Sequence, residues 1–357
     1  MALCRLVAQT VASMARHLVI QPAFLGDAVL ALPLIGRLKT LFPSAEVHAL
    51  VRTDVAPLLE GHPWISRLWT WDKTWRGWLT LLHQLRPHHW EGVWVVQRFF
   101  RSGLLGRLLP ASLYVTYDKN PLSWLYTRRA PHRIGDGTHE VDRVLALAAA
   151  AGLTPERPPL PWLFPPETAR QKVARWIERQ PYLILAPTSR WPTKEAPFRL
   201  WEAFLHNVPP SYTIYLTGLP SDRPRLEPLA RAHPAAHNLG GALTLPELAA
   251  LVQSATRVYT VDSALTHIAS ALGRPTTTVF CSTVPAFGFG PLAPHSTLVE
   301  TPRPLSCRPC GLHGKTACPL GHFACGHSLP LQDLIAPLLT EAPPPAAHTA
   351  ADPPPPT

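Results

Sequence analysis

Short apolar runs of strand length alternate with amphipathic, helix-like stretches along most of this chain. Runs that are apolar throughout are typical of parallel strands buried on both faces of a sheet. We place strands near residues 17–21, 46–51, 93–97, 182–186, 213–217, 257–261 and 276–280. Helices are expected near residues 28–41, 75–86, 139–151, 168–179, 197–206, 222–232, 245–254 and 264–272. The alternation predicts an α/β protein with doubly wound sheets, which bind ligands beyond the carboxyl ends of their strands.

A proline-rich segment divides the chain into two halves of similar size. Residues 154–166 read TPERPPLPWLFPP, in which six of thirteen residues are proline, and this composition is typical of a stiff linker. We therefore expect two Rossmann-like domains, over residues 17–153 and 167–340, that face each other across a substrate cleft. Residues 1–16 would form an N-terminal extension, and residues 341–357 a low-complexity, disordered tail.

Composition narrows the class of protein. The chain has 357 residues, of which 46% are hydrophobic and 16% charged, as in globular proteins of two domains. No apolar run reaches the roughly 18 residues that span a bilayer. The first residues resemble a signal peptide only weakly, because Arg5, Gln9 and Thr10 interrupt the apolar stretch, and Met14 offers an alternative start. We expect a cytoplasmic protein without a transmembrane segment.

The net charge of +10 favours anionic partners such as phosphorylated sugars, nucleic acid or an anionic membrane face. Nucleic acid is the weaker option, because the sequence has no dense Lys/Arg run and no interleaving of basic and aromatic residues. Neither a GxGxxG nor a GxxxxGK[ST] motif is present, which argues against NAD-dependent and P-loop chemistry.

An isolated carboxylate, Asp27, follows the first expected strand within the apolar stretch FLGDAVLALP. It is predicted to lie at or near a helix N-terminus, at the ligand-binding end of the sheet. The preceding Gly26 would permit the close approach of a ligand or a positive φ. Asp27 is then either a helix N-cap, which stabilises by about 1 kcal/mol, or a general base at the cleft. The local sequence does not separate the two.

Three polar loops follow expected strands of the second half, at residues 187–194, 218–222 and 262–267. The last opens a helix, whose free N–H groups and neighbouring hydroxyls suit an anion such as diphosphate. Lys194 and Arg190 would supply countercharge. Taken singly, Asp262-Ser263 is better explained as an ordinary capping pair, and His267 as a buried helix histidine. The convergence of three such loops at one edge of a sheet favours a site.

Four cysteines gather near the end of the second half, as Cys307, Cys310, Cys318 and Cys325. This pattern is compatible with a metal site, to which His322 and His327 would add ligands. The second pair is spaced more widely than in a zinc ribbon, and a cytosolic location disfavours disulfides. We favour reduced structural thiols and no metal, with a metal site as the alternative.

Several motifs in order resemble glycosyltransferase family 9, the ADP-heptose:lipopolysaccharide heptosyltransferases. The resemblance begins with LVIQPAFLGDAVLALPLIGRLKTLFPSAEVHALV and continues through HEVDRVLALAAAAGL, TSRWPTKEAPFRLW, NLGGALTLPELAALVQSA and VDSALTHIASALGRPTTTVFCSTVP. It ends with CRPCGLHGKTACPLGHFAC, which is similar to the cysteine-rich tail of the heptosyltransferase II-like branch. It extends from Met14 to about Thr340.

The resemblance implies a GT-B fold in which the first domain binds mainly the acceptor and the second the nucleotide-sugar. It implies inverting, metal-independent transfer of a heptose or similar sugar from an ADP-sugar to a hydroxyl of the lipopolysaccharide inner core. Asp27 matches the aspartate of the family's LGD turn, the general base. Lys194 matches the lysine of the WPTK loop, which contacts the donor phosphates. The family segment D-[ST]-G-x-x-H matches residues 262–267.

The site implied in this way needs no cofactor and no metal. Gly26 is the expected acceptor contact. The expected donor contacts are Thr188, Ser189, Lys194, Asp262, Ser263, Ala264, Leu265, Thr266 and His267. The expected partners are the nucleotide-sugar and an anionic glycolipid acceptor, approached from the cytoplasmic face of the inner membrane.

Three positions depart from the family pattern. Gln21 stands where many members have Arg, Ala264 replaces the usual Gly, and KEAPF replaces the common KRWP. These departures leave open another nucleotide-sugar as donor. A related branch of the family glycosylates autotransporter proteins and holds iron in a cysteine cluster. Both a protein acceptor and a metal therefore remain alternatives. A third alternative is a non-catalytic nucleotide-binding module with a zinc-stabilised tail.

Overall fold

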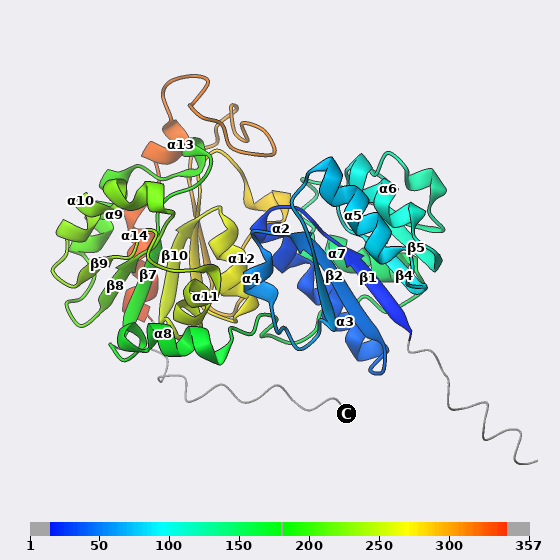
Figure 1. Ribbon diagram of the computed structural model, residues 1–357. Helices are drawn as coiled ribbons and strands as arrows, with labels where there is room; N and C mark the ends of the chain where they lie inside the picture. The colour runs from blue at the N-terminus through cyan, green and yellow to red at the C-terminus, as the bar shows by residue number, and fades with distance from the viewer. Residues whose placement is uncertain (1–14, 180, 341–357) are drawn as a thin grey trace, which may run out of the picture.

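The computed structural model describes residues 15–179 and 181–340. Its strands form two parallel sheets of six strands each, which lie side by side with helices around them (Figure 1). The expected doubly wound α/β architecture with two Rossmann-like halves is confirmed.

The first sheet has the strand order β3-β2-β1-β4-β5-β6, and all its neighbouring strands pair in parallel. Its strands are β1 Arg16–Ile20, β2 Glu46–Arg52, β3 Arg67–Trp71, β4 Trp90–Val95, β5 Ala111–Tyr117 and β6 Arg128–Ala130. Its helices are α2 Leu25–Leu30, α3 Leu32–Leu41, α4 Ala56–Leu59, α5 Trp75–Leu85, α6 Phe100–Leu108, η1 Ser123–Leu125 and α7 Glu140–Ala150.

The second sheet repeats this order as β12-β11-β10-β7-β8-β9. Its strands are β7 Tyr182–Ala186, β8 Thr213–Leu216, β9 Ala236–Asn238, β10 Arg257–Val261, β11 Thr276–Phe280 and β12 Thr297–Glu300. Its α-helices are α8 Glu167–Ile177, α9 Phe198–His206, α10 Arg223–Arg231, α11 Leu245–Ser254, α12 Ala264–Ala271, α13 Ala324–His327 and α14 Leu331–Thr340. Its 3₁₀ turns are η2 Pro192–Lys194, η3 Pro220–Asp222 and η4 Pro285–Phe287.

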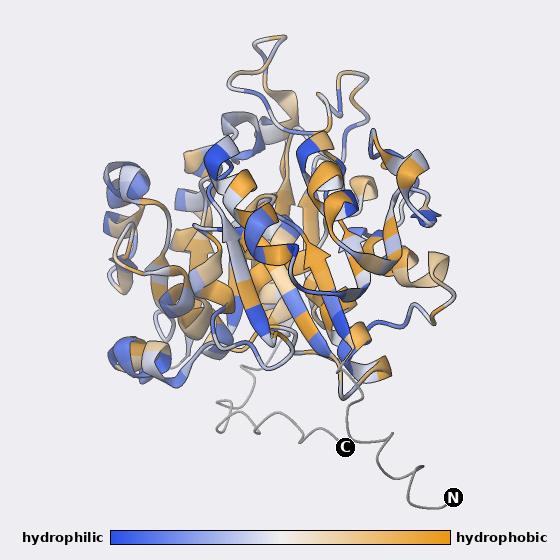
Figure 2. Ribbon diagram, turned by 45° about the vertical axis from the view of Figure 1, so that its right-hand side comes forward, coloured by the Kyte–Doolittle hydropathy of each residue, from blue (hydrophilic) through white to orange (hydrophobic). Residues whose placement is uncertain are grey.

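The central strands are buried on both faces, which explains their continuous apolar runs. Leu18, Val19 and Ile20 of β1 are almost fully buried, and every residue of β7, β10 and β11 is buried. Figure 2 colours the strands at its centre largely as hydrophobic, while the outlying helices carry both colours. Because helices cover both faces of each sheet, a ligand can reach the sheet only at the loops that follow the ends of the strands.

Five strands were not expected from the sequence, namely β3, β5, β6, β9 and β12. Four of them, β3, β6, β9 and β12, are the edge strands of the two sheets, each with at most two buried residues, and β6 and β9 are only three residues long. Such strands lack the continuous apolar run that marks a central strand.

The prediction of a single helix over residues 28–41 is wrong. The structure has α2 from Leu25 and a separate α3 from Leu32. The break at Ala31 follows from Pro33, which has no N–H to continue the hydrogen bonding of α2 and instead occupies the first turn of α3.

The proline-rich segment 154–166 contains neither helix nor strand and packs against both halves. The Trp162 backbone N–H donates to Ala271 O over 2.6 Å, and its carbonyl lies 2.9 Å from His62 Nε2. Trp162 and Leu163 are buried. The segment therefore fixes the two halves to each other at the end remote from the cleft loops.

Candidate active site

Four loops converge where the strand order of each sheet reverses. In the first sheet these loops follow β1 and β4, and in the second they follow β7 and β10. Such a switch point leaves a crevice at the carboxyl ends of the strands. Helix α2 follows β1 and helix α12 follows β10, and the two helices pack against each other between the sheets (Figure 1). The switch points of both halves therefore meet.

Gly26 is at the closest point of this helix contact. A Cβ on Gly26 would lie 2.8 Å from His267 Cδ2 and 3.6 Å from Ala264 Cα. Its φ is not positive, so the residue is needed for space and not for a special backbone conformation. The close neighbour of Gly26 is thus the second half of the protein itself, and the expected acceptor contact at Gly26 stays a prediction.

Asp27 is the third residue of α2, and the N-cap is Phe24, whose side chain makes no capping bond. The interpretation of Asp27 as the N-cap is therefore wrong, although the residue does lie in the first turn. Desolvation by the surrounding protein and the negative charge of Glu140 raise the pKa of Asp27 to about 6. A hydrogen bond from the Phe24 backbone and the charges of Arg98 and Lys194 act in the opposite direction. A carboxylate so placed is a stronger base than an exposed one and is still ionised at neutral pH.

Lys194 faces this region from the second half, at the end of η2. Its Nζ lies 2.7 Å from Oδ2 of Asp262, and both side chains are largely buried. The same Oδ2 accepts a hydrogen bond of 2.6 Å from Thr283 Oγ1. The ion pair therefore joins the loop after β7 to the loop after β10, as expected for two parts of one site.

The N-terminus of α12 has no side-chain cap. Ser263 is the N-cap, but its Oγ lies 3.1 Å from Thr260 Oγ1 and not at the helix N–H groups. The capping interpretation of Asp262-Ser263 is therefore wrong. The uncapped first turn begins with Ala264 and Leu265, so its N–H groups remain available to an anion.

The rest of the 262–267 segment is turned inward. Thr266 is fully buried, and its Oγ1 bonds Val261 O and Thr278 Oγ1. His267 is buried as well, in agreement with the interpretation as a buried helix histidine, and its Nδ1 has no hydrogen-bond partner. Burial lowers the pKa of His267 to about 4, so the imidazole is neutral at pH 7.

The remaining residues of the loop after β7 hold the loop in shape. Thr188 Oγ1 donates to Asp222 Oδ2 over 3.1 Å, and the Ser189 N–H donates to Glu195 Oε1 over 2.9 Å. The guanidinium of Arg190 lies 5.1 Å from the ring of Phe24, which belongs to the first half. Arg190 therefore reaches a side chain of the first half, while Thr188 and Ser189 bond to residues of the second half.

Two charged residues near Asp27 were not singled out from the sequence. Arg98 lies three residues beyond the end of β4, so the rule that sites form beyond strand ends would have found it. Glu140 begins α7 and accepts hydrogen bonds from Arg143 Nε over 2.7 Å and His132 Nε2 over 3.4 Å. Burial would raise the pKa of Glu140, but the bonds from His132 and Arg143 outweigh it and lower that pKa. Glu140 therefore remains charged and acts on Asp27.

Helix α7 makes a second contact between the halves. Arg143 donates to Phe287 O over 2.6 Å, the Glu140 N–H donates to Gly288 O over 2.8 Å, and His139 Nε2 lies 3.0 Å from Gly290 O. These bonds hold the helix that carries Glu140 against the second half.

The cysteine-rich segment, residues 307–325, packs on the loop that carries Lys194. The Lys315 N–H donates to Thr193 Oγ1 over 2.7 Å, and the Thr193 N–H donates to Lys315 O over 3.1 Å. A Cβ on Gly314 would lie 2.5 Å from Trp191 Cβ and 2.9 Å from Lys194 Cγ. The segment is thus a support for Lys194, which the sequence did not indicate.

The four cysteines of this segment are free thiols. Hydrogen bonds from backbone N–H groups, first that of Phe323, lower the pKa of Cys318. Within residues 15–179 and 181–340, no three His, Cys, Asp or Glu side chains are arranged to hold a metal ion. In the same part of the chain, no helix has both the length and the apolar character to cross a bilayer.

Comparison with known proteins agrees with this fold. Residues 78–317 match the family model described as glycosyltransferase family 9 (heptosyltransferase). A curated relative, lipopolysaccharide heptosyltransferase 3 of Escherichia coli K12, is 28% identical over 285 residues, covering 72% of this chain and 80% of the relative.

Two solved structures have the same fold. A family 9 glycosyltransferase from Veillonella parvula superposes with a TM-score of 0.80 at 18% identity, covering 91% of this chain and 96% of the other. An E. coli heptosyltransferase solved with ADP superposes with a TM-score of 0.65 at 20% identity, covering 79% and 92% of the two chains.

Proposed function

The chain belongs to glycosyltransferase family 9 and is a glycosyltransferase. We propose that it transfers a heptose, or a similar sugar, from an ADP-sugar to a hydroxyl of the lipopolysaccharide inner core. One observation carries the proposal: Asp27 of the first half faces the Lys194–Asp262 pair and the uncapped start of α12 in the second half. The names of the E. coli relative and of the structure with ADP support the choice of sugar and nucleotide. The branch within the family stays a prediction.

Asp27 is the proposed general base. It takes the proton of the acceptor hydroxyl while the hydroxyl oxygen attacks the anomeric carbon of the donor. The bond from that carbon to the diphosphate oxygen breaks on the opposite face, so the configuration is inverted. The raised pKa of Asp27, about 6, brings the base closer to the working pH and strengthens the proton transfer.

The leaving diphosphate needs positive charge around it. Lys194 supplies a cation, and the first-turn N–H groups of α12, beginning at Ala264 and Leu265, supply partial positive charge. Asp262 holds Lys194 in place through its 2.7 Å contact before the donor binds. Arg190 adds a further cation on the same loop. With these groups present, we propose that the reaction needs no metal.

We further propose that the acceptor is an anionic glycolipid of the inner membrane, which the enzyme approaches from the cytoplasmic face. The net charge of +10 supports this choice, since the inner-membrane surface and a phosphorylated core are both negative. The donor would reach the cleft from the cytoplasm.

A donor screen tests the proposal directly. ADP-heptose should raise the melting temperature of the full chain more than UDP-, GDP- or CDP-sugars do, because stabilisation grows with the logarithm of ligand concentration over Kd. Transfer is then measured with ADP-heptose and lipopolysaccharide that lacks core heptose. A shift with another nucleotide-sugar alone would favour the alternative donor, and no shift with any of them would contradict the transferase proposal.

Two alternatives make different predictions. A family member that acts on a protein would transfer the sugar to a polypeptide and leave heptose-deficient lipopolysaccharide unmodified. A non-catalytic nucleotide-binding module would bind the nucleotide but show no turnover, and the substitution Asp27→Asn would leave its function intact.

A further inference from the structure

Five large apolar side chains are exposed along the carboxyl edge of the first sheet and the helix that starts there. Trp75 and Leu79 of α5 are 57% and 60% exposed. Phe99 and Phe100 at the start of α6 are 67% and 47% exposed, and Trp124 of η1 is 70% exposed. We call these five residues the apolar rim. Exposed apolar groups are ordinary when single, but a cluster marks an interaction site.

Contacts hold the parts of the rim together. Trp78 Nε1 donates to Arg101 O over 3.0 Å, and the Arg101 guanidinium lies 5.4 Å from the ring of Trp75, so α5 and the start of α6 are adjacent. Asn120 Nδ2 donates to Phe99 O over 3.4 Å, which places the loop that leads to Trp124 beside α6. The rim is therefore one surface built from three segments.

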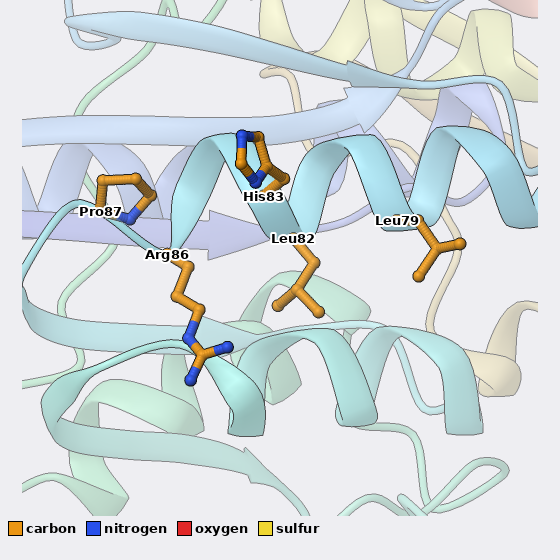
Figure 3. Close-up of a pocket in the computed structure, with 5 residues that line it drawn as sticks. All are labelled: Leu79, Leu82, His83, Arg86 and Pro87. Atoms are coloured by element: carbon orange, nitrogen blue, oxygen red, sulfur yellow. The ribbon is translucent and has the colours of Figure 1, made fainter.

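The apolar surface of helix α5 is wider than the part that the core covers. Trp78, Leu81 and Leu85 are buried in the core, while Trp75 and Leu79 extend this apolar surface onto the exposed flank of the helix. A hollow lined by Leu79, Leu82, His83, Arg86 and Pro87 adjoins this flank, and Figure 3 shows Leu82 and Arg86 directed toward a neighbouring helix. Apolar side chains that the core leaves uncovered are available to a partner.

Basic residues lie next to the segments that form the rim. Lys73 and Arg76 flank Trp75 in the sequence, and the Arg101 guanidinium lies over the Trp75 ring. Lys73 is turned inward, with its Nζ bonded to Pro22 O over 2.9 Å. Arg107 and Lys119 belong to the same segments, as do the carboxylates Asp72 and Asp118, of which Asp118 pairs with Arg133 at 2.8 Å. Basic residues outnumber carboxylates in these segments. The surface is thus apolar and aromatic at its centre and cationic at its margin.

We propose that the apolar rim docks the enzyme on an anionic phospholipid bilayer. Aromatic side chains prefer the boundary between headgroups and hydrocarbon, and Lys or Arg near an anionic surface adds attraction. This inference rests on the proposed function, because it supplies the surface by which the enzyme reaches a membrane-embedded acceptor. Phe99 directly follows Arg98, whose charge acts on Asp27, so the docked rim places the catalytic cleft beside the headgroups.

Vesicle binding tests the proposal. The full chain is mixed with vesicles of phosphatidylglycerol and phosphatidylethanolamine, or of phosphatidylcholine alone, and the bound fraction is measured by flotation. We expect binding to the anionic vesicles that weakens as salt is raised, because the cationic part is screened. Equal binding to neutral vesicles, or none to anionic ones, would overturn the proposal.

Substitutions locate the surface. The triple variant Trp75→Ser/Phe99→Ser/Trp124→Ser should reduce vesicle affinity at least tenfold. The matched control is Leu339→Ser in α14 of the second half, where the side chain is 74% exposed, and it should bind as the wild type does. The double variant Arg76→Gln/Lys119→Gln, which removes two positive charges, should weaken vesicle binding mainly at low salt. The single variant Arg231→Gln on α10 should leave vesicle binding unchanged. A triple variant that binds like the control contradicts the proposal.

Two further measurements separate this inference from the proposed transfer reaction. The triple variant should keep the melting-temperature shift with ADP-heptose and its turnover on a deacylated, water-soluble acceptor, but lose turnover on acceptor embedded in vesicles. Loss on the soluble acceptor with vesicle binding intact would make the rim an acceptor-sugar surface and overturn membrane docking. Vesicle binding by a wild-type chain that transfers no sugar would instead contradict the proposed function and leave the docking surface standing.

Discussion

Gly26 of α2 and His267 of α12 are in direct contact between the two halves of the molecule, with room for a hydrogen atom but not for a methyl group on Gly26. A Cβ there would lie 2.8 Å from His267 Cδ2. Asp27 follows Gly26 in the same helix turn, so this contact also sets the position of the proposed base.

The substitution Gly26→Ala should therefore destabilise the protein and misplace Asp27. We expect a loss of about 1–3 kcal/mol in the free energy of unfolding, measured by urea denaturation, because a methyl group is forced into a packed contact. Gly290→Ala is the control, since its Cβ would meet only Leu298 at 3.7 Å. In a double-mutant cycle, His267→Ala should relieve part of the cost of Gly26→Ala; fully additive effects would contradict the contact.

Asp27→Asn should abolish most turnover and leave donor binding intact. A general base contributes about 10²–10⁴-fold, so kcat should fall by that factor while the Kd for ADP stays within about twofold. In the wild type, kcat/KM should fall as the pH drops below about 6, because the base becomes protonated at its raised pKa. If the residual activity of Asp27→Asn still fell below about pH 6, the group that ionises there would be one other than Asp27.

The same substitution should stabilise the protein at neutral pH. The pKa of Asp27 is raised by desolvation, so the folded state holds this proton more tightly than the unfolded state. The ionisation of Asp27 therefore lowers the free energy of unfolding more and more as the pH rises from about 4 to about 6, and by a constant amount above that. Asp27→Asn should gain about 1–3 kcal/mol at pH 8 and little at pH 4, as measured by denaturant unfolding at both values. Equal differences at the two pH values would argue against a raised pKa.

Lys194→Ala should weaken the donor complex. It removes the proposed phosphate contact and leaves the buried Asp262 with Thr283 as its remaining side-chain partner. We expect the Kd for ADP to rise about 10- to 100-fold, as for the loss of a charge-assisted contact, with some loss of stability. Lys315→Ala is the control, because Lys315 contacts Thr193 through its backbone and its side chain is exposed. Isothermal titration calorimetry gives both affinities.

Gly314→Ala tests whether the cysteine-rich segment positions Lys194. A Cβ at this position would press on Trp191 and Lys194, so the loop must shift. We expect KM for the donor to rise about tenfold, with kcat at saturating donor reduced much less, because Asp27 is not displaced. A fall in kcat alone, or no change in either constant, would contradict a positioning role.

The sequence predicted the central strands, because burial on both faces leaves an uninterrupted apolar run such as LVI in β1 or YLILA in β7. It predicted that Asp27, Lys194 and residues 262–267 lie beyond strand ends, and the structure places all of them there. It missed the short edge strands β6 and β9, which have little apolar surface to show. The ion pair of Lys194 with Asp262 was also missed, since only the fold determines which residues of two separate loops meet.

The neighbours of Asp27 were missed for a similar reason. Glu140 belongs to a helix far along the chain, and its effect on Asp27 depends on how α7 packs. The support that residues 314 and 315 give to the Lys194 loop is equally non-local. A single sequence does not indicate such contacts, because a Glu at the start of a helix or a Gly and a Lys in a loop are common for local reasons alone.

The contact of α7 with the second half has an evolutionary consequence. The hydrogen bonds that α7 and its N-cap His139 make to the second half end on main-chain carbonyls, at Phe287, Gly288 and Gly290. Since all residues present the same carbonyl, a change of side chain at position 290 would not remove its bond. Gly288 is constrained, because its φ is +87° and a Cβ would collide with Thr138 O. This part of the contact between the halves therefore tolerates sequence divergence, because it does not depend on matched pairs of side chains.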